Sequence, residues 1–138
     1  MLFNEKEKTI MYDLKMNDRG WFSSSYDALI DSFEMEIKVA VDADDYQGDS
    51  LYVLRDDAKY GFLCFGWGSC SGCDALQSCL DSGNVLQELT ELRDELFGSI
   101  IWFDSLPELQ TWVANRDWRG TWMDNRLVRD FQAAVQQL

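Results

Sequence analysis

Apolar and charged residues alternate along "EMEIKVAVD", residues 34–42. The apolar positions are Met35, Ile37, Val39 and Val41. The charged positions between and beside them are Glu34, Glu36, Lys38 and Asp42. Successive side chains of a strand point to opposite faces of a sheet, so the pattern predicts a strand with one buried and one charged face.

Three further apolar segments predict the rest of a sheet. "LYVLR" (residues 51–55) and "YGFLCFGW" (residues 60–67) are separated by the polar turn "DDAK", and "SIIWF" spans residues 99–103. Aromatic and β-branched residues favour strands, and a short polar turn favours a hairpin. We therefore expect an antiparallel three-strand meander plus a short fourth strand.

Apolar residues recur at helical spacing in the other segments. After the capping residue Asn84, the apolar positions are Val85, Leu86, Leu89, Leu92, Leu96 and Phe97. The inner face predicted for the C-terminal helix comprises Leu127, Val128, Phe131, Ala134, Val135 and Leu138. Both sets repeat every three or four residues, as one face of an α-helix does.

The sequence predicts three shorter helices, two of them marked by capping signals. Ser105, Pro107 and Glu108 form a capping-box pattern with proline near the first turn. Ser24 or Ser25 can cap a helix that carries Ala28, Leu29, Ile30 and Phe33, and "CDALQSCL" (residues 73–80) is a further short helix. The sum predicts an α+β fold, a small antiparallel sheet covered on one face by helices.

The composition supports one folded domain over residues 1–138. The chain has 138 residues, of which 46% are hydrophobic and 14% aromatic, enough to build a core. The segment of about 1–24 carries the weakest pattern and is expected to be the least ordered part. No apolar run approaches the ~18 residues of a membrane helix, and the charged N-terminal residues do not resemble a signal peptide. We expect a cytoplasmic protein.

Charge narrows the function further. The 25 acidic residues outnumber the 12 basic ones and give a net charge of −13. Residues 27–57 hold ten acids and two bases, and residues 71–110 hold eight acids and one base, Arg93. Such a chain repels nucleic acid and anionic membranes and attracts basic partners. Because basic proteins are mostly nucleic-acid binders, a basic nucleic-acid-binding protein is the expected partner.

The absence of histidine argues against an enzyme. The chain has no histidine at all, which removes the usual general base and the commonest transition-metal ligand. We therefore expect no catalytic residues and no cofactor. A partner-binding surface is the leading hypothesis, and a solvated surface that only keeps the chain soluble is its alternative. The candidate partner-binding residues are Glu34, Glu36, Asp42, Asp44, Asp45, Asp49, Asp56, Asp57, Glu88, Glu91 and Glu95.

The four cysteines offer a second hypothesis, a small zinc-binding or thiol-redox protein. They are Cys64, Cys70, Cys73 and Cys79, in the spacing C-x5-C-x2-C-x5-C. Four thiolates can bind zinc, and Cys70 and Cys73 at a helix start could form a redox pair. Only one CxxC pair is present, however, and six residues of helix turn Cys79 about 240° from Cys73. The preferred interpretation of the segment is a glycine-hinged connection from strand to helix, in which the cysteines pack as small apolar side chains.

The aromatic C-terminal region suggests a third hypothesis, a structural or scaffold subunit. Tryptophan and arginine alternate there and are common in interface hot spots. The residues are Trp112, Arg116, Trp118, Arg119, Trp122 and Arg126. Whether the chain forms a homo-oligomer stays open.

In size and charge the chain resembles the small acidic anti-defence proteins of bacteriophages and mobile elements, such as anti-CRISPR proteins and DNA mimics. The resemblance rests on the two acidic blocks, residues 27–57 and 71–110, and includes no diagnostic motif. It implies an inhibitor of a host defence nuclease, such as a CRISPR effector, that acts in the host cytoplasm if a phage encodes it. The acidic surface would then occupy the nucleic-acid channel of that nuclease.

Overall fold

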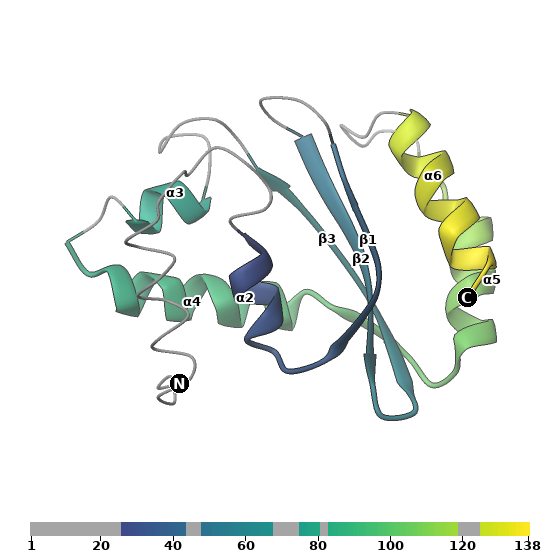
Figure 1. The fold of residues 1–138 in the computed structure, drawn as a ribbon, viewed down its shortest axis with the longest axis horizontal. Helices are drawn as coiled ribbons and strands as arrows, with labels where there is room; N and C mark the ends of the chain where they lie inside the picture. The colour runs from purple at the N-terminus through teal and green to yellow at the C-terminus, as the bar shows by residue number, and fades with distance from the viewer. Residues whose placement is uncertain (1–25, 44–47, 68–74, 81–82, 119–124) are drawn as a thin grey trace. The chain divides into compact units, whose positions relative to one another are not determined.

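The structure is a computed structural model that describes residues 26–43, 48–67, 75–80, 83–118 and 125–138. The segment of about 1–24, which the sequence predicts to be the least ordered, lies outside these residues. The chain divides into two compact units. One contains α2 (Asp27–Asp31), α3 (Ala75–Leu80) and α4 (Val85–Gly98). The other contains the sheet and the two C-terminal helices (Figure 1).

The sheet has four strands, in the order in which they follow along the chain. They are β1 (Glu36–Asp42), β2 (Gly48–Asp56), β3 (Lys59–Trp67) and β4 (Ile101–Phe103). β1 pairs with β2, and β3 with β4, in antiparallel register. The α+β fold, with a three-strand meander and a short fourth strand, is therefore confirmed. The β2–β3 turn contains Asp57 at a left-handed φ of 58°, a conformation that aspartate tolerates better than most residues.

A bulge interrupts the alternation predicted for β1. Ile37 lies opposite Leu54 and Val39 opposite Val53, so the register shifts across Lys38. Val39 and Val41 pack into the core between the sheet and the helices, whereas Ile37 is not found among the described residues of that core. The prediction that all four apolar residues of this segment share one face is therefore wrong for Ile37.

Two helices pack on one face of the sheet. They are α5 (Leu106–Asn115) and α6 (Asn125–Gln136), which Figure 1 shows together on one side of the strands. The buried core between them comprises Val39, Leu51, Val53, Phe62, Leu109, Val113, Leu127, Phe131 and Val135. The inner face predicted for the C-terminal helix is confirmed, with Ala134 and Leu138 at its partly buried border.

The central strand β2 is buried on both faces. Leu51, Tyr52, Val53 and Leu54 are consecutive and each is at most 1% exposed. Since neighbouring side chains point to opposite faces, this strand has buried side chains on both of its faces. Tyr52, on the face opposite Val53, stacks on Phe65 of β3 with ring centroids 5.8 Å apart.

The predicted capping box starts α5. The Glu108 backbone N–H donates to Ser105 Oγ at 3.4 Å, and Glu108 Oε2 accepts from the Asp104 N–H at 3.2 Å. Pro107 occupies the first turn, where its missing N–H has no cost. These contacts fix where the helix begins.

A few specific contacts hold the helices of the helical unit together. The Leu76 N–H of α3 donates to the Tyr26 hydroxyl at 3.1 Å, and α3 packs against α4. On α4, Leu89, Leu92 and Leu96 are buried, as their spacing predicts. Phe97, however, is 44% exposed, so its prediction as an inward residue is wrong. It follows Leu96 by about 100° around the helix, and its ring and that of Phe33 pack edge to face with their centroids 5.3 Å apart.

Candidate functional site

A row of glutamates on α4 is the best-defined acidic feature. Glu88, Glu91 and Glu95 are three and four residues apart, so they lie along one side of the helix. Glu91 and Glu95 are exposed and Glu88 is partly buried. Glu91 accepts a hydrogen bond from Gln87 at 3.4 Å, across one helical turn. The helix thus brings three of the candidate partner-binding residues to one side, and their role in binding stays a prediction.

Arg93, the single cation of the 71–110 block, is removed from the surface. Its side chain is only 9% exposed; Nε donates to Ser32 Oγ at 2.8 Å and Nη2 to the Ser32 carbonyl at 3.0 Å. The guanidinium also lies 5.5 Å from the centre of the Phe33 ring and pairs with Asp94 at 3.7 Å. Arginine suits such a site because its flat group can stack and donate at once.

Acidic residues therefore supply all the exposed charge among the described residues of the helical unit. Asp31, Glu34, Glu91 and Glu95 are exposed, while Asp94 and Glu88 are partly buried. This asymmetry was not visible in the sequence, where Arg93 counts as a surface cation. It follows from the burial of one side chain.

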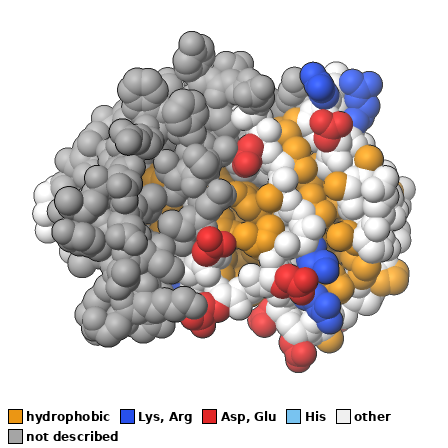
Figure 2. Space-filling view, in the orientation of Figure 1, with side chains coloured by type: hydrophobic (Ala, Val, Ile, Leu, Met, Phe, Trp, Pro, Cys, Tyr) orange, Lys and Arg blue, Asp and Glu red, His pale blue; other side chains and the backbone are white. Residues whose placement is uncertain are grey.

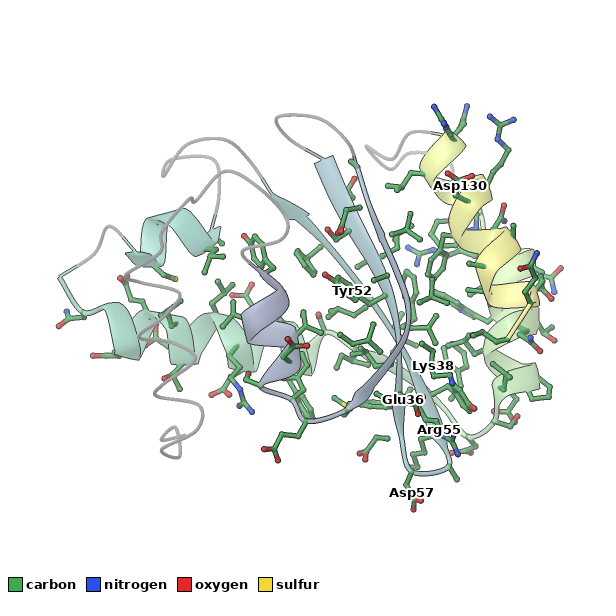
Figure 3. The ribbon with its side chains drawn as sticks, viewed as in Figure 1. Glu36, Lys38, Tyr52, Arg55, Asp57 and Asp130 are labelled. Carbon is green, nitrogen blue, oxygen red and sulfur yellow. The ribbon has the colours of Figure 1, made fainter. Side chains whose placement is uncertain are left out.

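The acids of β1 are in a different electrostatic setting. Glu36 lies beside two cations, with Lys38 Nζ at 3.1 Å and Arg55 Nη1 at 3.9 Å (Figure 3). On the side of the molecule that Figure 2 shows, the acidic side chains of the described residues are scattered among apolar and uncharged ones, and basic side chains lie beside some of them. Local pairing thus offsets part of the negative charge that the sequence assigns to this strand.

The other candidate acids of the sheet unit lie near the turns that join β1 to β2 and β2 to β3. The Ser50 hydroxyl donates to Asp42 at 2.5 Å, and Asp56 and Asp57 are exposed at the β2–β3 turn. Burial raises the pKa of the Asp49 carboxyl, whose buried Oδ2 accepts no hydrogen bond from the described residues. Asp44 and Asp45 lie outside the described residues.

The candidate acids thus belong to both units. Glu34 and the α4 glutamates lie in the helical unit, and Glu36, Asp42, Asp49, Asp56 and Asp57 lie in the sheet unit. A single contiguous acidic surface over residues 27–110 stays a prediction.

The surroundings of Cys64 disfavour its thiolate form. Burial, and then the nearby Asp49 carboxylate, raise the pKa of the Cys64 thiol to about 12, although Arg116 acts in the opposite direction. Cys79 is buried, and its Sγ donates to the Glu88 carbonyl at 3.4 Å. Metal binding and thiol exchange both need a thiolate, so Cys64 is poorly suited to either.

The zinc hypothesis draws no support from the described part of the chain. No group of three or more histidine, cysteine, aspartate or glutamate side chains that could hold a metal occurs among the described residues. Cys64 and Cys79 belong to different units, and Cys70 and Cys73 lie outside the described residues.

An aromatic cluster around Arg116 is the feature that sequence reasoning located least well. The Arg116 guanidinium lies over three rings, with its carbon 4.6 Å from the Trp118 centroid, 5.0 Å from Trp112 and 5.3 Å from Phe62. Trp112 and Trp118 are partly buried against the core. The spacing W-x3-R-x-W was the available signal, but only the fold adds Phe62 from β3. Trp122 and Arg119 lie outside the described residues.

A groove beside this cluster has a volume of about 640 Å³. It runs along α5 from Pro107 to Asn115 and is bordered by Phe103 of β4. Its position next to Arg116, which forms no ion pair with another described residue, makes it the second candidate site.

The comparisons with known proteins identify no relative. No family model matches the chain, and neither curated proteins nor solved structures give a match. None of the described helices is long and apolar enough to cross a membrane.

Proposed function

We propose that this chain is a non-enzymatic binding protein that presents an acidic surface to a basic, nucleic-acid-binding partner. The observation that carries the proposal is the burial of Arg93, because it leaves only carboxylates as exposed charges among the described residues of the helical unit. The α4 row of Glu88, Glu91 and Glu95 is the centre of the proposed surface.

The spacing of the row fits the role. Carboxylates one helical turn apart repeat at about 5.4 Å, so an arginine- or lysine-lined groove that binds a phosphate backbone can meet them in succession. A net charge of −13 also steers a basic partner toward the protein over long range. The acids of β1 contribute less, since Glu36 is already paired within the sheet unit.

The specific form of the proposal is an inhibitor of a host defence nuclease, such as a CRISPR effector. It is supported by small size, by the charge and by the lack of histidine. In this form the carboxylates compete with nucleic acid for the basic channel of the nuclease.

The test is affinity purification from bacterial lysate with mass spectrometry, followed by binding measurements with the captured protein. We expect a basic nucleic-acid-binding protein whose affinity falls at least about tenfold between 50 and 300 mM salt and which duplex DNA displaces. A captured partner that is not basic, or a complex indifferent to both salt and DNA, would contradict the proposal.

Two charge-matched variants locate the surface. E88Q/E91Q/E95Q removes three charges from α4, and E36Q/D56N/D57N removes three from the sheet unit. We expect the first to weaken partner binding at least about tenfold and the second to weaken it less. Equal losses would show that total charge, rather than the α4 row, drives binding.

A further inference from the structure

The groove along α5 has an apolar body and polar ends. Phe103 and Trp112 form its aromatic side, with ring centroids 5.4 Å apart, and Pro107 extends the apolar surface. Thr111 and Asn115 add a hydroxyl and an amide along the same side of the helix. A volume of about 640 Å³ is in the range of sites that hold small organic molecules.

Arg116 is the cation at one end of the groove. Its guanidinium is held between aromatic rings from β3, α5 and Trp118, and no ion pair or hydrogen bond joins it to another described residue. Stacking occupies the flat faces of a guanidinium and leaves the N–H groups at its edge able to donate. The three rings also fix its position, so an anion meets a pre-organised donor.

Glu108 is the negatively charged residue at the other end of the groove, and its carboxylate is already hydrogen-bonded within the protein. Its Oε2 accepts from the Asp104 N–H, and its own N–H donates to Ser105, as part of the α5 capping box. The helix start also offsets its charge. The groove therefore combines an apolar wall with one cation that lacks a carboxylate partner among the described residues.

We propose that this groove binds a small amphipathic carboxylate, with an aryl or branched alkyl body on Phe103 and Trp112 and its carboxylate on Arg116. One planar guanidinium matches one carboxylate in charge and in geometry. A phosphate dianion would need more positive charge than one arginine supplies in a protein of net charge −13. A second copy of the chain is disfavoured as the occupant by the same repulsion.

The test compares two probes with the same body, 3-phenylpropionate and its neutral amide, 3-phenylpropionamide. Binding is followed by ¹H–¹⁵N NMR through the indole N–H signal of Trp112, assigned with Trp112→Phe. We expect the carboxylate to bind about 10- to 100-fold tighter than the amide, as a charge-assisted hydrogen bond requires. Equal affinities, or no shift of the Trp112 signal at millimolar probe, would overturn the proposal.

Two variants locate the cation. In Arg116→Gln the two probes should bind equally, whereas Arg129→Gln, which removes the same charge from an exposed site on α6, should keep the preference for the carboxylate. Retention of the preference in Arg116→Gln would refute the role of Arg116. The comparison of the two probes on the unchanged protein decides the proposal even if Arg116→Gln does not fold.

Sedimentation equilibrium tests the competing occupant. We expect a monomer in the presence and absence of probe. A dimer that persists at millimolar 3-phenylpropionate and leaves the Trp112 signal unshifted would show that a second copy fills the groove, and the proposal would then be wrong.

Discussion

Asp49 and Cys64 show how position in the fold changes a side chain's chemistry. They lie on the neighbouring strands β2 and β3, near enough for the Asp49 carboxylate to raise the pKa of the Cys64 thiol. Burial raises both pKa values, and it comes first among the causes for each. Asp49 was a candidate for meeting a cation on the surface, yet its partial burial makes it less available than the exposed acids of that set.

Asp49→Asn should stabilise the protein at neutral pH. A carboxyl whose folded-state pKa is raised above the unfolded value of 3.8 binds more protons when folded, so ionisation at pH 7 favours unfolding. The gain should shrink as the pH falls through the folded pKa and disappear below about pH 4. Urea unfolding at several pH values measures it.

The control for this prediction is Asp56→Asn, which removes the same charge from the exposed β2–β3 turn. If both variants gain equally at pH 7, the effect comes from net charge rather than from the burial of Asp49.

The pairing of β3 with β4 depends on a missing side chain. Gly61 lies opposite Trp102, and a Cβ atom at Gly61 would lie 2.5 Å from Ile100 Cγ2 and 3.1 Å from the Trp102 ring. A strand interior normally disfavours glycine, but here it marks a close approach of neighbouring side chains. β4 is only three residues long, and Trp102 is its middle residue, so a clash at Gly61 would disturb the pairing of the whole strand.

Gly61→Ala should lower the free energy of unfolding by about 1–3 kcal/mol, because the added methyl group overpacks the β3–β4 contact. Gly98→Ala is the matched control: nothing lies within 4 Å of its Cβ position at the end of α4. It should be neutral or stabilise by up to about 1 kcal/mol through the unfolded chain. Chemical unfolding of both variants gives the comparison, and equal effects would contradict the packing argument.

The net negative charge of the molecule is the basis of the proposed function, and it also lowers the stability of the folded state. The chain has 25 acids and only 12 bases, so its excess carboxylates repel one another in the folded state. The burial of Arg93 leaves fewer cations at the surface to offset them. A fold that keeps such a charge has a core strong enough to tolerate it. In the sheet unit this core includes Phe62, Phe131 and Leu109, each at most 2% exposed.

Added salt should therefore stabilise the protein. Raising sodium chloride from about 20 to 500 mM shortens the Debye length from roughly 20 to 4 Å and screens the repulsion between exposed carboxylates. Thermal unfolding should shift upward, and E88Q/E91Q/E95Q should show a smaller shift because three of the charges are gone. A salt response that is absent, or that has the opposite sign, would contradict this account.

Local pattern alone determined the strands, the main helices and the acidic blocks, because side-chain periodicity and capping act over a few residues. The capping box at Ser105 and the inner face of α6 are examples. The tertiary structure decided what depends on distant segments: the burial of Arg93 against Ser32, the shift of register at Lys38, and the meeting of Phe62 with Arg116. Burial and pairing are properties of neighbours in space, and the order of residues along the chain does not contain them.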